Sequence, residues 1–314
     1  MARVAVVGSL NMDLVIRAAH LPSAGETVLG GTFATFAGGK GANQAVGAAR
    51  LGATVAMVGR VGDDAFGRLL RDGLAHERID ASGVRTDAGA ATGVALITVD
   101  SAGQNTIVVA SGANAALTRE DVDAARNEIA QSAVVLLQLE VPLDVVHYTA
   151  QIAHAAGCAV ILDPAPAPGE PLPDELYRLL SVIHPNEVEA RALTGITITT
   201  EADARRAAEA LLARGCAAAV IKLGARGAYL AAGTRREAVP AIRVTPVDTT
   251  AAGDAFAAGM AVALAEQAPL AAAVQFATAV GALKVTRMGA QPSMPTREQL
   301  REFVRQQRVA LPFQ

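Results

Sequence analysis

A stretch from Val247 to Phe256 carries the clearest chemistry in the sequence. Alternating apolar residues before it predict a strand, and Phe256, Met260 and Leu264 at helical spacing predict a helix after it. Small residues at the start of a helix leave N–H groups that attract anions such as phosphate. A carboxylate there, Asp254, would repel phosphate unless it accepts a proton from the attacking group. We interpret Asp254 as the general base of a phosphoryl transfer; the alternative is an ordinary helix N-cap.

Two further polar clusters lie near the N-terminus. Residues 3–7 predict a buried strand, and Asn11 and Asp13 follow its end, where open α/β sheets place their ligands. The alternative is a turn in which both side chains bond their own backbone. A glycine-rich run around Lys40 then begins a helix that reaches about residue 51, with Asn43 in its first turn. The run does not match a P-loop, so we interpret Lys40 and Asn43 as donors to a polar ligand, or the run as a hinge.

The succession of helix, glycine and apolar strand occurs three times, around Gly52, Gly157 and Gly215. Each glycine is typical of a helix C-cap, and each strand is too apolar to face water on either side. This pattern predicts an α/β fold, a three-layer sandwich with a mostly parallel central sheet flanked by helices. Polar residues that follow the predicted strands, each also readable as a cap or a turn, should gather near one sheet edge: Glu140, Asp163, Asn186 and Glu189.

Two segments, at about residues 14–36 and 92–110, depart from this pattern. No crossover helix follows their short extended pieces, which are 14–16, 27–33, 93–99 and 106–109. They predict a small antiparallel β-sheet, inserted in a single domain of residues 1–314. Such a sheet would cover a cleft as a lid or meet a partner.

Two loops in the C-terminal half also suggest ligands. Gly224 and Gly227 have the spacing of a tight turn between two strands, which a nucleotide could approach. Residues 285–293 follow a long Ala-rich stretch and are rich in main-chain oxygens. Together with Asp248 and Thr250 they predict a site for a hard cation, or a plain return loop.

The composition excludes several classes of function. Lys and Arg number 27 against 30 Asp and Glu, and aromatic residues are only 3%, so no nucleic-acid surface is expected. The Ala-rich region is interrupted by Glu266 and Pro269, which argues against a membrane span. The two cysteines lie in apolar runs, and without a recognisable signal peptide we expect a cytoplasmic protein. Serine-hydrolase, histidine–metal and dinucleotide-binding motifs are not found.

Taken together, six motifs resemble the ribokinase family of carbohydrate kinases. They are Asn11-x-Asp13, Gly38-Gly39-Lys40-Gly41-Ala42-Asn43, Pro185-Asn186-x-x-Glu189, Leu223-Gly224-x-x-Gly227, Asp248-Thr249-Thr250-Ala251-Ala252-Gly253-Asp254 and Gly289-Ala290-Gln291-Pro292-Ser293. The resemblance spans essentially the whole chain, in order and at the family's spacing. It is therefore far more specific than any single motif.

The resemblance implies a role for each matched residue. Asp254 would take the proton from the sugar hydroxyl, beside an anion hole formed by the amides of Ala251, Ala252 and Gly253. The sugar would be bound by Asn11, Asp13, Gly39, Lys40, Asn43, Glu140 and Asp254. ATP would be contacted by Asn186, Lys222, Gly224, Gly227, Gly253 and Thr278. Mg²⁺ would be arranged by Asn186 and Glu189, and K⁺ would be held, mainly by main-chain oxygens, at Asp248, Thr250, Lys284, Arg287, Gly289 and Ser293.

The activity implied by the resemblance is the ATP-dependent phosphorylation of D-ribose at its 5-hydroxyl, assisted by Mg²⁺ and activated by K⁺. The nearest alternative is a kinase of the same family for deoxyribose, another pentose or a hexose. A sugar-binding regulator without turnover is a second alternative, because fold does not fix function, and a dinucleotide oxidoreductase is a third. The resemblance also implies a homodimer formed through the lid sheets.

Overall fold

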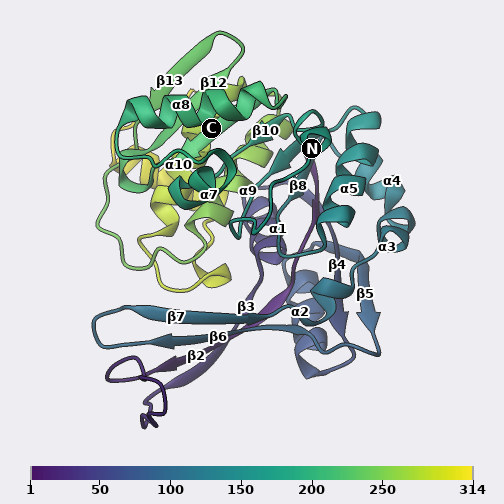
Figure 1. Cartoon of the computed structure of the whole chain (residues 1–314), viewed down its shortest axis with the longest axis vertical. Coiled ribbons are helices and arrows are strands. Elements are labelled where there is room, and N and C mark those ends of the chain that lie inside the picture. Colours follow the sequence, from purple (N-terminus) through teal and green to yellow (C-terminus); the bar gives the residue numbers. More distant parts are fainter. Residues whose placement is uncertain (1, 313–314) are drawn as a thin grey trace.

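The computed structural model describes residues 2–312, which form a large body sheet and a small lid sheet (Figure 1). The body sheet has nine strands in the order β13-β12-β11-β10-β9-β8-β1-β4-β5. Their bounds are β1 (Arg3–Val7), β4 (Thr54–Gly62), β5 (Asp80–Asp87), β8 (Val134–Leu137), β9 (Ala159–Leu162), β10 (Val182–Ile183), β11 (Ala218–Lys222), β12 (Ala228–Ala232) and β13 (Arg235–Val239). All neighbouring strands from β5 to β11 in this order are parallel. The pairs β11–β12 and β12–β13 are antiparallel. The mostly parallel central sheet is confirmed.

Helices cover both faces of the body sheet (Figure 1). Along β1, Val4 and Val6 pack into one apolar core, and Ala5 and Val7 into the other, because successive strand residues point to opposite faces. One face is covered by α1 (Lys40–Arg50), α2 (Ala65–His76), α9 (Ala252–Ala265), α10 (Leu270–Lys284) and α11 (Arg297–Gln306). The other is covered by α3 (Arg119–Ala124), α4 (Arg126–Ala130), α5 (Leu143–Ala155), α6 (Asp174–Tyr177), α7 (Glu187–Thr194) and α8 (Glu201–Ala213). This is the predicted three-layer sandwich.

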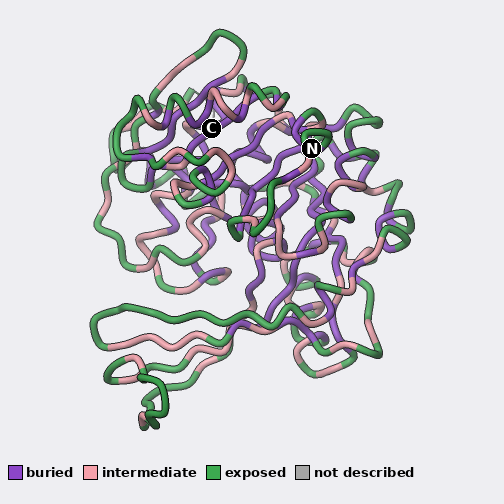
Figure 2. Tube along the Cα trace, in the orientation of Figure 1, coloured by how far each residue is buried: buried purple, intermediate pink, exposed green. Residues whose placement is uncertain are grey.

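The lid sheet projects from one end of the body and is largely exposed (Figures 1 and 2). Its strand order is β3-β2-β6-β7, with bounds β2 (Asn11–Arg17), β3 (Phe33–Gly38), β6 (Gly93–Val99) and β7 (Asn105–Ala110). The expectation of an antiparallel sheet is wrong for its central pair, because β2 and β6 run parallel. Both strands start from a buried residue at the body and run outward, so their directions agree.

Two details of the lid also differ from the sequence prediction. The piece expected at 27–33 is not a strand, and β3 instead begins at Phe33 and ends at Gly38. Two glycines at positions 30 and 31 disfavour a strand there, since they carry no side chain to pack. Asn11 and Asp13 do not lie in a turn, because the chain continues from β1 through a short connection into β2.

The strand expected before Asp248 is absent as well. Residues 240–247 form an irregular segment without strand pairing. Pro240 and Pro246 lack the N–H group that a strand ladder needs, which explains the missing pairing. The alternation of apolar residues in this segment has another cause, because the side chains of Ile242 and Val244 pack against the core without strand pairing.

The Ala-rich region forms two helices, α9 and α10, which are separated by a break at residues 266–269. Both are buried over most of their length. Within residues 2–312, no helix combines the length and apolar character that a membrane crossing requires.

Candidate active site

The N-terminus of α9 presents free backbone amides. Its N-cap is Ala251, whose φ of 58° lies in the left-handed region that residues with a Cβ rarely adopt. No side chain caps α9, whereas α3, α8 and α11 each begin with a threonine capping box. Among the described residues, no acceptor is found for the amides of Ala251 and Gly253, while the Ala252 amide donates to the Thr249 carbonyl at 3.1 Å. In this conformation, two of the three predicted anion-hole amides are therefore free.

Asp254 lies in the first turn of α9 and is 4% exposed. Its Oδ2 accepts a hydrogen bond from Asn43 Nδ2 at 2.9 Å, and its Oδ1 accepts one from Gln44 Nε2 at 3.2 Å. Ala251 occupies the N-cap position, so the side chain of Asp254 binds α1 and does not cap its own helix. Burial raises the pKa of Asp254 to about 6, although the ammonium of Lys40 opposes the shift. A carboxylate with this pKa is ionised at neutral pH and can accept a proton.

Three residues expected to bind the sugar surround the same region, where the lid joins the body. Lys40 is the first residue of α1, and Glu140 follows β8. Glu140 Oε2 accepts hydrogen bonds from the Lys40 amide at 3.2 Å and from Ser9 Oγ at 2.5 Å. Burial, with repulsion from Glu140 and Asp254, raises the pKa of Asp13 to about 7. Asp13, Glu140 and Asp254 together make this junction acidic.

Asn11 and Gly39 fix the backbone at this junction. Asn11 Oδ1 accepts a hydrogen bond from Asn114 Nδ2 at 2.7 Å, and the Asn11 side chain is almost fully buried. Gly39 has a φ of 86°, and a Cβ on it would lie 2.6 Å from the Asn11 amide nitrogen. Only glycine permits this close approach. Asn43 Oδ1 is buried and has no hydrogen-bond partner among the described residues, so one acceptor remains available beside Asp254.

A buried chain of polar residues lies behind Asp254, and two of its members, Gln44 and Gln138, were missed from the sequence. Gln44 Nε2 donates to Asp254 Oδ1 and also to Asp163 Oδ2 at 3.1 Å, and Gln44 Oε1 accepts from Gln138 Nε2 at 2.7 Å. Asp163 Oδ1 accepts in turn from Lys222 Nζ at 2.7 Å. The signal for Gln44 was that an uncharged polar residue stands inside a predicted helix of mainly small residues. Gln44 belongs to no motif, and only its fully buried position shows that it supports Asp254.

Lys222 lies at the end of β11, beside the anion loop. Its Nζ is 3.8 Å from Glu189 Oε2 and 3.4 Å from the position that a Cβ on Gly253 would occupy. Asn186 and Glu189 form a capping box at the start of α7, with Asn186 Oδ1 accepting from the Glu189 amide at 2.9 Å. The plain capping interpretation of this pair is therefore correct, and the Glu189 carboxylate also faces the Lys222 ammonium.

The remaining nucleotide candidates lie on a turn and on a helix. Gly224 begins a short 3₁₀ turn (η2, Gly224–Arg226) between β11 and β12, as predicted. Gly227 ends it with a φ of 94°, and a Cβ there would lie 2.0 Å from the Val239 carbonyl oxygen. Thr278 Oγ1 donates to the Val274 carbonyl at 2.8 Å inside α10, so its proton is used within the helix.

The predicted cation loop is brought together by the fold. Asp248 Oδ1 accepts from the Thr250 amide at 2.9 Å, and Asp248 Oδ2 accepts from the Gly289 amide at 2.8 Å. Ser293 Oγ donates to the Gly289 carbonyl at 2.5 Å. Lys284 Nζ donates to the Asp248 carbonyl oxygen at 2.9 Å. The segment before α9 is thus fastened to the loop after α10, although the two lie far apart in the sequence.

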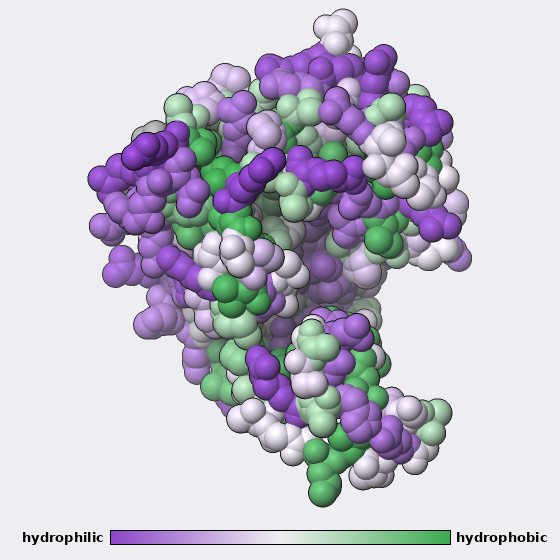
Figure 3. Space-filling model, turned by 90° about the vertical axis from the view of Figure 1, so that its left-hand side faces the viewer, coloured by the Kyte–Doolittle hydropathy of each residue, from purple (hydrophilic) through white to green (hydrophobic). Residues whose placement is uncertain are grey.

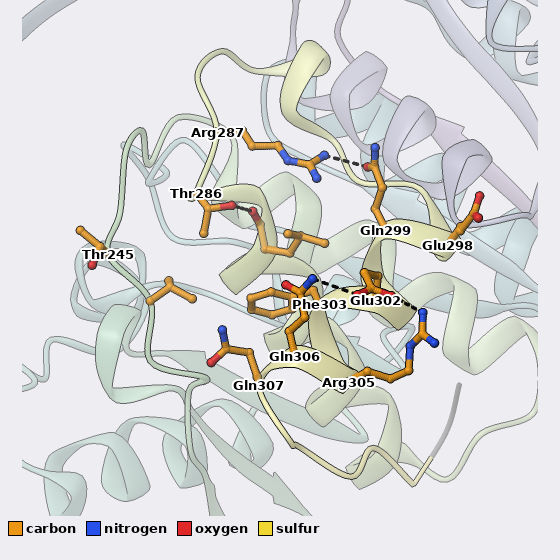
Figure 4. A pocket seen from close by; sticks show the side chains of 12 residues that line it. Thr245, Thr286, Arg287, Glu298, Gln299, Glu302, Phe303, Arg305, Gln306 and Gln307 are labelled. Atoms are coloured by element: carbon orange, nitrogen blue, oxygen red, sulfur yellow. Dashed lines mark hydrogen bonds and ion pairs between the residues drawn. The ribbon is translucent and has the colours of Figure 1, made fainter.

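A cavity of about 650 Å³ lies on the outer side of this loop, between residues 244–245, the end of α10 and α11 (Figure 4). Arg287 lines it, and its guanidinium donates to Gln299 Oε1 of α11 at 2.7 Å (Figure 4). None of the residues bonded to Asp254 lines this cavity. The residues around Asp254 lie instead where the lid meets the body, and Figure 3 shows the molecule hollowed between these two parts.

Comparison with known proteins identifies the family. Residues 1–297 match the profile of the pfkB family carbohydrate kinases. The chain belongs to this family. It is therefore a carbohydrate kinase, which transfers a phosphoryl group to a sugar hydroxyl, and the resemblance seen in the sequence is confirmed.

Three known proteins are similar to this chain over nearly its whole length. The ribokinase of Haemophilus influenzae is 42% identical over 299 residues, which cover 95% of this chain and 97% of that protein. The deoxyribokinase of Salmonella typhi is 36% identical over 301 residues, which cover 96% of this chain and 98% of that protein. The solved structure of Arabidopsis thaliana ribokinase complexed with ribose and ATP is 36% identical, with a TM-score of 0.90 over 97% of this chain and 99% of that one.

Proposed function

We propose that this kinase phosphorylates D-ribose at the 5-hydroxyl with ATP, giving D-ribose 5-phosphate and ADP. The observation that carries the proposal is the position of the Asp254 carboxylate. It lies in the first turn of α9, which presents free amides, and it is bonded to Asn43 of the expected sugar site. The ribokinase of Haemophilus influenzae and the Arabidopsis complex with ribose and ATP support ribose as the acceptor.

In the proposed reaction, Asp254 accepts the proton of the 5-hydroxyl while the sugar oxygen bonds to the γ-phosphorus. The bond from the γ-phosphorus to the β–γ bridging oxygen breaks, and ADP leaves with that electron pair. Amides of Ala251, Ala252 and Gly253 donate to the charge on the transferred group. Lys222, whose Nζ lies beside Gly253, adds positive charge at the same place.

The proposed sugar site is acidic as well as polar. Glu140 lies close enough to Asp13 to raise the pKa of Asp13, so a phosphorylated acceptor would be repelled and a neutral sugar is favoured. The hydroxyls of the sugar would be bound by Asn11, Asp13, Gly39, Lys40, Asn43 and Glu140. The nucleotide would be bound by Asn186, Lys222, Gly224, Gly227, Gly253 and Thr278.

We propose that Mg²⁺ enters the site with the phosphates of ATP. Within residues 2–312, no three or more His, Cys, Asp or Glu side chains are grouped to hold a metal ion, so the phosphates and water would provide most ligands. Glu189, with Asn186, is the proposed protein contribution. Bound Mg²⁺ would neutralise phosphate charge, which matters here because Asp163, Glu189 and Asp254 are all close by.

We propose further that K⁺ can stimulate the reaction by ordering the cation loop, to the extent that the ammonium group of Lys284 does not already order it. The residues that would hold it are Asp248, Thr250, Lys284, Arg287, Gly289 and Ser293, mainly through main-chain oxygens. Oxygen ligands of this kind suit a weakly hydrated monovalent cation, and a fixed loop would keep the amides of Ala251 and Gly253 in position. One of these oxygens, the Asp248 carbonyl, already accepts a hydrogen bond from Lys284.

We propose a homodimer formed through the lid sheet, which belongs to a single kinase domain of residues 1–314 and works in the cytoplasm. The lid exposes several large apolar side chains to solvent: Ile16, Phe33, Leu96, Ile107, Val108 and Val109. Ile16 and Phe33 are opposite each other on paired strands, as are Leu96 and Val108, and exposed apolar pairs of this kind favour association. A monomer mass by sedimentation equilibrium at micromolar concentration would contradict the dimer.

A substrate panel tests the proposed function. ADP release is measured with ribose, 2-deoxyribose, a second pentose and a hexose, at saturating ATP and Mg²⁺. We expect ribose to have the highest kcat/KM, and the phosphorus NMR spectrum of the product to show a phosphate coupled to the two C5 protons. A higher kcat/KM for 2-deoxyribose would favour the second candidate, which the Salmonella typhi relative supports. ADP release that no sugar stimulates would overturn both.

A further inference from the structure

Lys284 is a fully buried ammonium group outside the catalytic centre. It lies in the last turn of α10, is 0% exposed, and is among the largest fully buried side chains of the described residues. Its Nζ donates to a neutral partner, the main-chain carbonyl oxygen of Asp248, at 2.9 Å. Burying a charge on a neutral acceptor is costly unless opposite charge is close. Here the carboxylates of Asp248 and Asp254 offset only part of the cost of burial.

The carbonyl group that Lys284 binds belongs to the segment that leads into the anion loop. The amides of Val247 and Asp248 both donate to the Val285 carbonyl, and the Asp248 carboxylate accepts from the amides of Thr250 and Gly289. These contacts hold residues 247–250 against the end of α10. The next residue, Ala251, is the left-handed N-cap of α9 whose amide is free. Lys284 therefore stabilises the segment on which the geometry of the anion loop depends.

We propose that the ammonium group of Lys284 acts as a built-in monovalent cation of this loop. The inference rests on the proposed kinase function and on the proposed site for K⁺. An ammonium group and K⁺ carry the same charge, have similar sizes and are both satisfied by carbonyl oxygens. Because Lys284 Nζ already binds the Asp248 carbonyl, it performs in advance part of the ordering that K⁺ would perform, and it competes with K⁺ for this oxygen.

The other basic side chain of the cation loop does not provide this charge. Arg287 is three residues beyond Lys284, after the end of α10, and its guanidinium donates to Gln299 of α11 beside the outer cavity (Figure 4). Among the six residues of the loop, Lys284 alone directs a cationic group at a main-chain oxygen of the loop. The chain should consequently respond weakly to K⁺, and it should respond strongly once the ammonium group is removed.

The test compares the native chain with Lys284→Met, which keeps the length and apolar stem of the side chain but has no charge. Arg305→Met is the matched control, because it removes one positive charge from an exposed site on α11. The first measurement is the thermal unfolding midpoint of the ligand-free protein, in KCl and in tetramethylammonium chloride of the same ionic strength. We expect the Lys284→Met midpoint to fall by about 3 °C or more without K⁺, since a charged hydrogen bond is lost, and to recover at least half in KCl.

The second measurement is kcat with saturating ribose and Mg·ATP in the same two salts. We expect K⁺ to change kcat of the native chain and of Arg305→Met by less than about twofold, and that of Lys284→Met by about tenfold or more. The proposal is overturned if K⁺ activates the native chain as strongly as the variant. It is also overturned if Lys284→Met without K⁺ is as stable and active as the native chain.

Two further points keep the test decisive. If Lys284→Met does not fold, Lys284→Gln, which keeps a donor without the charge, is measured in its place, and a strong response of the native chain to K⁺ still contradicts the proposal. If no sugar is phosphorylated, the proposed function fails, but the unfolding midpoints still report whether Lys284 and K⁺ replace each other.

Discussion

Replacing Asp254 by asparagine removes the proposed base and changes little else. Both carboxylate oxygens accept hydrogen bonds, from Asn43 at 2.9 Å and from Gln44 at 3.2 Å. Asparagine has one acceptor oxygen, which Gln44 can use, and one amide group that needs an acceptor. Rotation of the Asn43 amide would present its unpartnered Oδ1 to this group, so the local packing can be kept. We therefore expect Asp254→Asn to fold normally.

The expected effect is on the chemical step. General base catalysis contributes roughly 10²- to 10⁴-fold, or about 3–5 kcal/mol of the barrier. We expect kcat to fall at least ~10²-fold, while KM for ribose changes less than about threefold, because an amide can still bond the 5-hydroxyl. The native kcat should also decrease as the pH falls through the pKa of Asp254, about 6, because the base must be ionised.

The assay is a coupled spectrophotometric measurement of ADP release across a pH series. In Asp254→Asn, the decrease of kcat near pH 6 should disappear with the group that causes it. Asp174→Asn is a suitable control, because this carboxylate lies on α6 and bonds Arg214 on a different surface. A kcat for Asp254→Asn within about tenfold of the native value, with the same pH profile, would refute its assignment as the base.

Three other substitutions test the surroundings of Asp254. Lys222→Met should lower kcat by about 10²-fold and also destabilise the fold, because Asp163 is left buried without its partner; combining it with Asp163→Asn should restore the unfolding midpoint but not kcat. Gly227→Ala should lower the free energy of unfolding by about 2 kcal/mol or more and raise KM for ATP, as measured by thermal unfolding and kinetics. Its control is Gly73→Ala, in an open helical position, which should leave stability unchanged or increase it. Asp13→Asn should stabilise the ligand-free protein at pH 8 by up to about 4 kcal/mol, but not at pH 4.

The sign of the last effect follows from the raised pKa. Burial raises the pKa of Asp13 from its ordinary value of 3.8, which holds for the unfolded chain, to about 7 in the folded state. Between these two pH values the folded protein holds a proton that the unfolded chain has lost, so folding stability falls as the pH rises. Asparagine cannot ionise, so it avoids this loss. The free energies of unfolding of Asp13→Asn and of the native protein are compared at pH 4 and at pH 8. If the variant is no more stable relative to the native protein at pH 8 than at pH 4, the pKa of Asp13 is not raised by burial and by its acidic neighbours.

Local patterns in the sequence were enough to predict many of the elements. The apolar run at residues 3–7 is β1, and the glycine-rich run around Lys40 begins α1, which ends at Arg50. These predictions succeed because a strand buried on both faces and a helix that follows a glycine-rich run depend on neighbouring residues. The irregular segment before Asp248 was predicted wrongly, since its apolar alternation reflects tertiary packing and its prolines prevent pairing.

The sequence by itself determined the fold class and the family, and it named the candidate site residues, because each of these depends on short motifs and their order. The tertiary structure decided which side chains meet. Gln44 and Asp254 are 210 residues apart and share a hydrogen bond, and Lys284 reaches the carbonyl of a loop 36 residues away. Such contacts depend on how helices cross and where each side chain points. Only the packed core fixes these, so the support behind Asp254 and the buried cation of its loop appear only in the folded molecule.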